Sequence, residues 1–377
     1  MNIVIAPDSF KGSLSALGVG RALEKGIKRA IPESVTKIIP MADGGEGTMD
    51  CLIEATGGRF VGAQVQGPLG RPIESGFGLL GDGETCVIEM AMSSGLYLIG
   101  RHERNPLRTT TYGFGQLIRT ALDEGCRNFI LALGGSATND GGAGMLQALG
   151  VELLDEAGQP LGYGGGELAR LAAIRKDGLD PRLAESRFTV ACDVDNPLVG
   201  PHGASAVFGP QKGATPEMVA ELDRCLRRFA DLTERETGVA IHDLPGAGAA
   251  GGLSGGIVAY LNGELESGVA IVGRTAGLEE AVRTADLVIT GEGQVDFQTA
   301  RGKTPWGVTR TAQAHGVPVI VVAGSVGTGI EALYEHGVTA VFSIVNRPMT
   351  LEEAMEKTEP LLEAAAEQLI RIVQLRA

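Results

Sequence analysis

The sequence predicts an α/β protein of two domains, one built on a parallel sheet and one that also contains antiparallel strands. At 377 residues the chain is long for a single hydrophobic core. Near both of its ends, short apolar strands alternate with helical patterns, which is typical of a parallel sheet. Between those ends, from Arg59 onward, alternating residues are separated by Gly-Pro and Gly-Asp-Gly turns, which indicates antiparallel strands.

Two strand–helix units open the chain. The apolar run 3–5 predicts a buried strand, and the loop 7–13 and an amphipathic helix follow it. A second strand at 35–39 leads into the loop 41–48, after which a helix runs to about Thr56. Charged residues therefore follow each strand at its carboxyl end, where α/β folds place their ligands.

The strand–helix pattern returns near the C-terminus. Three strands are predicted there, at 287–289, 317–322 and 338–342. The two N-terminal strands alone are too few to bury a core, whereas all five together make a parallel sheet of normal size. We therefore expect a discontinuous domain of residues 1–59 and 284–377, with residues 60–283 inserted as a second domain.

Composition excludes several classes of partner. The formal net charge of −14 argues against nucleic acid and against an anionic membrane surface, because both need a basic surface. The five cysteines include no Cys-x-x-Cys pair, which favours neither a disulfide framework nor a zinc site. No signal peptide and no apolar run of membrane-spanning length is present, so we expect a cytoplasmic protein.

Three familiar catalytic motifs fail on inspection. The segment Gly302-Lys303-Thr304 looks like the end of a P-loop, but Phe297 stands where the first glycine is needed. A Gly-x-Ser-x-Gly pattern at 252–256 follows a Gly/Ala-rich stretch rather than a strand, so a hydrolase nucleophile elbow is not indicated. Protein-kinase signatures are missing as well.

A glycine-rich loop from Leu133 to Gly144 follows an apolar strand and precedes a helical pattern. Such a turn can bind an anion, because its backbone N–H groups and the helix N-terminus point at one spot. The structural alternative is a tight strand-to-helix turn in which Ser136, Thr138 or Asp140 caps the helix. This loop alone does not decide between the two.

Several other polar, glycine-flanked loops also follow predicted strands. Phosphoryl transfer needs such a mixture: carboxylates for Mg²⁺, a base near the acceptor hydroxyl, and lysines or backbone N–H groups for phosphates. Lys11, Lys212 and Lys303 each lie beside a glycine in such a loop. Taken singly, each lysine is better explained as a surface charge than as a ligand.

Together these segments resemble the type-1 glycerate kinase family of bacteria. The resemblance rests on Ala-Pro-Asp-Ser-Phe-Lys-Gly-Ser at 6–13, Met-Ala-Asp-Gly-Gly-Glu-Gly-Thr at 41–48, the loop 133–145, Val-Phe-Gly-Pro-Gln-Lys-Gly-Ala at 207–214, Pro-Gly-Ala-Gly-Ala-Ala-Gly-Gly at 245–252 and Ile-Thr-Gly-Glu-Gly at 289–293. It implies ATP-dependent phosphorylation of D-glycerate, at the 2-hydroxyl. It also implies a discontinuous domain and an inserted flavodoxin-like domain, with the site in the cleft between them.

We hypothesise a role for each candidate residue of such a kinase. Asp193 is the proposed base, and Lys11, Asp43 and Lys303 complete the catalytic set. Mg²⁺ is assigned to Glu46 and Asp296. Binding of substrate and phosphate is assigned to Asp8, Ser9, Gly134, Gly135, Ser136, Asn139, Asp140, Asn196 and Lys212.

Other readings stay open at this point. The product could be 3-phosphoglycerate, or the acceptor another small hydroxy acid. A non-catalytic protein that binds a phosphorylated metabolite is the alternative from a different class. A homo-oligomer and the nucleotide preference stay open as well.

Overall fold

The computed structural model describes residues 1–376, which form two compact units. The first unit combines Met1–Asp43, Asp50–Thr56 and the chain from Ser267 onward. The second unit contains Gly44–Met49 and Gly57–Glu266. Each unit has a sheet and a hydrophobic core of its own.

A five-stranded sheet forms the centre of the first unit. Its strands are β1 (Asn2–Pro7), β2 (Val35–Ile38), β11 (Leu287–Val295), β12 (Val319–Val326) and β13 (Val338–Ser343). All neighbouring strands pair in parallel, in the order β13-β12-β11-β1-β2. The parallel five-stranded sheet predicted from the two ends of the chain is thus confirmed.

The strand order of this sheet indicates where a ligand would bind. Counted along the first unit, the order reads 2-1-3-4-5, which is the flavodoxin-like order. We expected a flavodoxin-like fold for the inserted domain, but the flavodoxin-like strand order occurs in the discontinuous domain. In such sheets ligands bind at the carboxyl ends of the two strands where the order reverses, here β1 and β11.

Helices cover both faces of this sheet. The helical segments of this unit are α1 (Ala16–Ala30), α2 (Thr48–Thr56, of which Asp50–Thr56 group with the unit), α9 (Gly268–Thr275), α10 (Leu278–Val282), η7 (Thr299–Arg301), α11 (Thr304–Ala314), α12 (Glu331–Glu335), α13 (Leu351–Glu356), α14 (Thr358–Val373) and η8 (Gln374–Arg376). Ile320 and Val322 of β12 share a core with α1 and α14, whereas Val321 packs in a smaller cluster with Leu333 of α12. Adjacent strand residues point to opposite faces, so both faces are buried.

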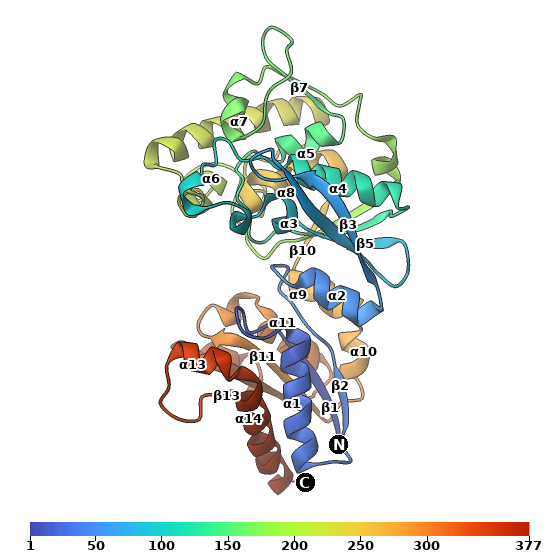
Figure 1. Ribbon diagram of the computed structural model, residues 1–377, viewed down its shortest axis with the longest axis vertical. Coiled ribbons are helices and arrows are strands. Elements are labelled where there is room, and N and C mark those ends of the chain that lie inside the picture. Colours follow the sequence, from blue (N-terminus) through green and yellow to red (C-terminus); the bar gives the residue numbers. More distant parts are fainter. Residues whose placement is uncertain (377) are drawn as a thin grey trace. The chain divides into compact units, whose positions relative to one another are not determined.

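Helices α1 and α14 pack side by side on the first face, although they come from opposite ends of the chain (Figure 1). Gly26 makes this close approach possible, because a Cβ there would collide with the backbone carbonyl of Glu363. Ser15 caps α1 by accepting a hydrogen bond from the N–H of Gly18 over 3.2 Å. The packing ties the N-terminal and C-terminal segments into one core.

Residues 267–283 group with the first unit, and not with the inserted domain for which we expected them. They form α9 and α10, which pack against α11 and against each other. Val269, Ile271 and Val272 of α9 are buried. This apolar face therefore belongs to the first unit although it precedes the third strand of that sheet.

The second unit contains a mixed sheet of six strands in the order β10-β9-β6-β5-β4-β3. The strands are β3 (Arg59–Gln66), β4 (Pro72–Leu79), β5 (Thr85–Glu89), β6 (Asn128–Ala132), β9 (Arg187–Ala191) and β10 (Glu264–Glu266). Strands β3, β4 and β5 pair antiparallel, and β5, β6, β9 and β10 pair in parallel. The antiparallel strands predicted after Arg59 are confirmed. A separate two-stranded ribbon joins β7 (Glu152–Leu154) to β8 (Ala173–Arg175).

Helices surround the mixed sheet. They are α3 (Ala91–Ser94), α4 (Tyr112–Asp123), α5 (Ala143–Ala148), α6 (Ala204–Phe208), α7 (Pro216–Thr237) and α8 (Leu253–Leu261), with short 3-10 helices η1 (Leu96–Leu98), η2 (Arg101–Glu103), η3 (Gly165–Arg170), η4 (Pro181–Glu185), η5 (Pro210–Lys212) and η6 (Ala249–Gly252). Phe129 of β6 stacks on Phe188 of β9 with ring centroids 4.7 Å apart. No helix within residues 1–376 is both long and apolar enough to cross a bilayer.

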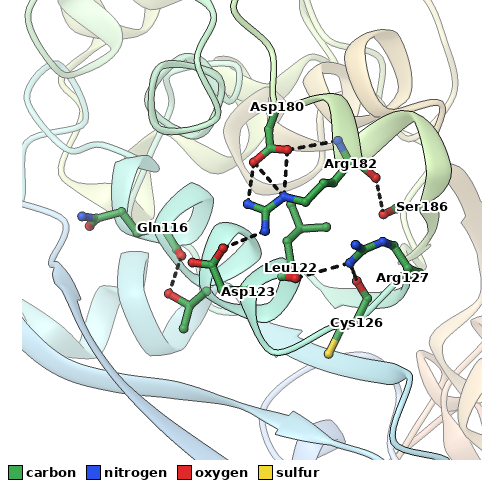
Figure 2. Close-up of polar contacts among 9 residues, drawn as sticks. Gln116, Leu122, Asp123, Cys126, Arg127, Asp180, Arg182 and Ser186 are labelled. Carbon is green, nitrogen blue, oxygen red and sulfur yellow. Dashed lines mark hydrogen bonds and ion pairs between the residues drawn. The ribbon is translucent and has the colours of Figure 1, made fainter.

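Arg182 links two segments of the second unit (Figure 2). Its Nε and Nη2 donate to the two carboxylate oxygens of Asp180 at 3.0 and 2.7 Å, and its Nη1 donates to Asp123 at the end of α4 over 2.7 Å. The side-chain hydrogen bonds from Arg182 lower the pKa of Asp180. The forked guanidinium thereby ties η4 to α4.

Candidate active site

The first unit contains a pocket of about 510 Å³ at the carboxyl ends of its parallel strands. Residues at the ends of β1, β11, β12 and β13, four neighbouring strands, all line it. Asp8 and Lys11 follow β1, and Glu292 lies in the last part of β11. The pocket thus includes the point where the strand order reverses, which is the position that the fold favours for a ligand.

Asp8 is a buried carboxylate held in a fixed orientation. Its Oδ1 accepts a hydrogen bond from the backbone N–H of Ser9 over 2.6 Å, and its Oδ2 accepts one from the hydroxyl of Thr304 over 2.5 Å. Burial, and next the negative charge of Asp43, raise the pKa of Asp8. A cation placed beside these two carboxylates would relieve that repulsion.

Glu292 and Lys303 form an ion pair in the wall of the same pocket. Lys303 Nζ lies 3.3 Å from Glu292 Oε2, and the hydroxyl of Thr299 donates to Glu292 Oε1 over 2.7 Å. Burial raises the pKa of Glu292. The hydrogen bond from Thr299 and the positive charge of Lys303 partly oppose this rise. Lys303 is also the N-cap residue of α11, so its backbone lies at the positive end of a helix dipole.

Five of the residues singled out from the sequence line this one pocket: Asp8, Ser9, Lys11, Asp43 and Lys303. They come from the loops after β1 and β2 and from the residue before α11, nearly three hundred positions apart in the chain. Two lysines and three carboxylates, counting Glu292, therefore converge where the fold favours a ligand. The mixture suits a polyanionic ligand that carries a divalent cation.

The rest of the pocket wall is mainly apolar. Its apolar side chains are those of Phe10, Ile344, Val345, Met349, Leu351, Ala354 and Met355. Most of them come from the segment between β13 and α14. The pocket therefore has a charged part near β1 and β11 and an apolar part near β13.

The glycine-rich loop lies in the second unit and is mostly buried. Gly135 is exposed and Gly134 and Ser136 are half-buried, whereas residues 137–144 are buried. Gly135, Gly141 and Gly142 all have positive φ angles, which suits glycine. Only residues 134–136 of this loop are thus open to a ligand.

Asp140 organises the buried part of the loop. Its carboxylate accepts hydrogen bonds from the N–H and the hydroxyl of Thr111, both over 2.9 Å, and from the N–H groups of Gly142 and Gly144 at 3.1 and 3.3 Å. Burial raises its pKa, and these hydrogen bonds oppose the rise. The residue therefore joins the start of α5 to the start of α4, although the N-cap residue of α5 is Gly142 and not Ser136, Thr138 or Asp140.

Asn139 and Lys212 are buried against the same loop. Asn139 Nδ2 donates to the hydroxyl of Ser205 over 2.9 Å, and Lys212 Nζ donates to the backbone carbonyl of Thr138 over 2.7 Å. Burial lowers the pKa of Lys212 to about 7. These contacts fix the inner side of the loop to α6 and η5.

Asp193 and Asn196 lie in the loop after β9 of the second unit. Asp193 is exposed, and Asn196 Nδ2 donates to the carbonyl of His202 over 2.8 Å. Neither residue lines the pocket of the first unit. Their proposed roles remain predictions.

Comparison with known proteins identifies the family. The family model described as "Glycerate kinase family" matches residues 3–374, which is nearly the whole chain. The chain belongs to the glycerate kinase family. It is 54% identical to a glycerate kinase of Halalkalibacterium halodurans over 97% of this chain and 96% of that one, and 49% identical to the glycerate 2-kinase of Escherichia coli over 94% and 93%.

A solved structure supports the same assignment. The crystal structure of a candidate glycerate kinase 2 from Salmonella typhimurium matches with a TM-score of 0.91 and 47% identity, over 100% of this chain and 98% of that one. A match of that quality covers both units. As a member of the glycerate kinase family, the chain is an enzyme of the phosphotransferase class.

Neither of the two residues assigned to Mg²⁺, Glu46 and Asp296, is among the residues that line the pocket of the first unit. Asp296 does not line it, and its carboxylate accepts from Gln294 Nε2 and from the N–H of Gln298, both over 2.8 Å. Glu46 is an exposed residue of the second unit. Within residues 1–376 no three His, Cys, Asp or Glu side chains are grouped as metal ligands.

Sequence reasoning missed Glu292 and Thr304. Glu292 follows the apolar run 287–289 just as Asp8 follows the first strand, so its place at a strand end was the signal for it. Thr304 was visible only as part of a failed P-loop motif. Its contact with Asp8 depends on tertiary packing and leaves no trace in the local sequence.

Proposed function

We propose that this glycerate kinase family member transfers the γ-phosphoryl group of ATP to the 2-hydroxyl of D-glycerate, giving 2-phosphoglycerate and ADP. The observation that carries the proposal is the convergence of Asp8, Glu292, Lys11 and Lys303 on one pocket at the strand-order reversal. The name of the Escherichia coli relative, glycerate 2-kinase, supports the choice of hydroxyl.

The transfer is an in-line displacement, in which catalysis consists mainly of positioning and charge stabilisation. The hydroxyl oxygen of glycerate forms a bond to the γ-phosphorus while the bond to the β–γ bridging oxygen breaks, and the hydroxyl proton passes to a base. We assign the base to Asp193, whose exposed carboxylate follows β9. Lys11 and Lys303 neutralise charge on the transferred phosphoryl group and on the glycerate carboxylate.

Mg²⁺ fits the donor set of the pocket. Burial, and next the negative charge of Asp43, raise the pKa of Asp8, and two carboxylates that repel one another mark a place where a cation is favoured. Among the carboxylates considered, Asp8, Asp43 and Glu292 line the pocket and are the best placed to hold it, with Glu46 and Asp296 as the further candidates. One or two carboxylates suffice, because Mg²⁺ in kinases is completed by phosphate oxygens and water, and it neutralises charge on the phosphates.

The open part of the glycine-rich loop has a separate proposed role. The N–H groups of Gly134 and Gly135, with the hydroxyl of Ser136, are proposed to bind an anionic group of a substrate. Asn139, Asp140 and Lys212 support this loop from inside through the contacts described above. Their proposed contribution to phosphate binding is therefore indirect.

The test is ADP formation from ATP and Mg²⁺, assayed with and without D-glycerate. Dependence on D-glycerate is expected, and proton-coupled phosphorus NMR should show the phosphorus coupled to the single proton on C2. Coupling to two protons would mean 3-phosphoglycerate. Turnover only with another hydroxy acid, or binding without turnover, would reject the assignment.

A further inference from the structure

We infer that the pocket of the first unit is the nucleotide site, with the adenine base on its apolar side near β13 and the phosphates on its charged side near β1 and β11. The inference rests on the proposed kinase function, because it assigns one of the two substrates of that reaction to a place. Three independent features of the pocket carry it: the order of its polar and apolar residues, its size, and its exposed apolar rim.

The lining changes from charged to apolar in the order of the strands. Asp8 and Lys11 follow β1, Glu292 belongs to β11, Gly324 and Ser325 belong to β12, and Ile344 and Val345 follow β13. Because β1, β11, β12 and β13 are consecutive neighbours in the sheet, the lining changes from charged to apolar across the pocket in the same order. A nucleotide has the same polarity, with a charged phosphate chain at one end and a largely apolar base at the other.

The size of the pocket favours a nucleotide over a three-carbon acid. Three strand spacings separate β1 from β13, which is about 14 Å. The volume of about 510 Å³ falls in the range of pockets that enclose drug-sized ligands. Glycerate, with three carbon and four oxygen atoms, is far too small to span that distance.

Apolar side chains on the β13 side of the pocket are open to solvent. The exposed fraction is 76% for Leu351, 37% for Val345 and 36% for Met355. Three exposed apolar side chains beside one pocket are a typical feature of a ligand-binding surface. A flat, weakly polar base would cover such a surface, whereas neither phosphate nor glycerate offers it an apolar partner.

This apolar wall is held in place before any ligand binds. The hydroxyl of Ser13 contacts the backbone carbonyl of Met355 and the hydroxyl of Thr358, both over 2.6 Å. These contacts join the loop after β1 to α13 and α14 on the far side of the pocket. The charged and apolar parts are therefore built as one preformed site, which lowers the entropic cost of binding.

The inference is tested by isothermal titration calorimetry of the full chain with two probes, ADP and inorganic tripolyphosphate, in the presence of MgCl₂. The variant is Leu351→Ser/Val345→Ser, which removes exposed apolar groups without opening a core. We expect its Kd for ADP to rise about tenfold, with its Kd for tripolyphosphate within twofold of wild type. Lys11→Ala should weaken binding of both probes.

The matched control is Ile372→Ser, which changes an apolar residue of α14 whose exposed fraction, 56%, lies between those of Val345 and Leu351 and which does not line the pocket. It should bind both probes as wild type does. No ADP binding by the wild type, unchanged ADP affinity in the double variant, or equal loss of both probes would overturn the inference. A wild type that binds ADP as expected but shows no glycerate-dependent turnover would instead contradict the proposed function alone.

Discussion

The hydroxyl of Thr304 donates to the carboxylate of Asp8 over 2.5 Å, between residues 296 positions apart in the chain. Thr304 begins α11, and Asp8 follows β1. The N–H of Ser9 holds the other oxygen of the same carboxylate. The carboxylate of Asp8 therefore cannot rotate freely. Asp8 lines the pocket together with Lys303, the residue before Thr304.

Loss of the Thr304 hydroxyl should shift the pH dependence of activity. The hydrogen bond favours the ionised form of Asp8 and lowers its pKa, against the larger effect of burial. In Thr304→Val the pKa of Asp8 should rise, so the acid limb of the kcat/KM profile should move to higher pH. Thr304→Ser keeps the donor and serves as the control. Identical acid limbs in wild type and Thr304→Val would show that ionisation of Asp8 does not govern activity.

Lys11→Ala should reduce kcat by a factor of about one hundred or more, because a cation facing the phosphates is lost. Lys11 is exposed in its loop, so the fold should not change. Lys25→Ala is the matched control, since Lys25 pairs with Glu359 on the surface of α14. Steady-state kinetics of both variants measures kcat, and circular dichroism checks that both variants keep the fold. Normal turnover in Lys11→Ala would remove this residue from the mechanism.

Asp193→Asn should likewise reduce kcat by about a hundredfold or more, as expected for the loss of a general base. The amide keeps the shape of the side chain but accepts no proton at neutral pH. The neighbouring exposed carboxylate provides the control, Asp195→Asn, which should retain activity. If both variants turn over equally well, the base must be sought among the carboxylates of the first-unit pocket.

Local sequence patterns were enough to predict the architecture. Both ends of the chain carry apolar strands followed by amphipathic helices, and the size of a stable core requires them to share one sheet. The strand order could not be predicted in this way, because it depends on which strands pair with one another and not on the residues within any one strand. Likewise, α9 and α10 carry no sign in their own sequence that they pack on α11.

The site was predicted in part, for a related reason. Asp8, Lys11 and Asp43 follow strands, so the rule that ligands bind at strand carboxyl ends selects them, and all three line the candidate pocket. For the segment with Leu351 and Met355 the sequence predicted only a terminal helix, because no local pattern shows that these side chains line a pocket. In the opposite sense, Lys212 looked like a loop lysine, yet the fold buries it.

Removal of the Asp180 carboxylate should destabilise the second unit by about 1 kcal/mol, because a forked pair with Arg182 is lost at a partly exposed position. Arg182 lowers the pKa of Asp180, so this stabilisation is present above the pKa of an unfolded aspartate, about 3.9, and is lost as the pH falls through the lower folded value. Urea unfolding of Asp180→Asn at pH 7 and pH 3 measures it. The exposed Asp177→Asn is the control, and equal effects of Asp180→Asn at both pH values would contradict the prediction.

Lys212 should make the stability of the protein depend on pH in the alkaline range. Burial lowers its folded pKa to about 7, whereas an unfolded lysine titrates near 10.4. Between these values the unfolded chain binds more protons, so the free energy of unfolding should rise with pH, by up to about 1.4 kcal/mol per pH unit. Below pH 7 both states are protonated and this contribution becomes constant.

The measurement compares wild type with Lys212→Met by urea unfolding at intervals from pH 6 to pH 9.5. The methionine has a similar length and no charge, so the difference between the two proteins isolates the titration of the amine. It leaves the carbonyl of Thr138 without its donor, but that cost does not vary with pH. Lys176→Met, at an exposed site, should follow the wild-type profile. Parallel profiles for wild type and Lys212→Met would mean that the folded protein keeps the Lys212 amine charged throughout this range.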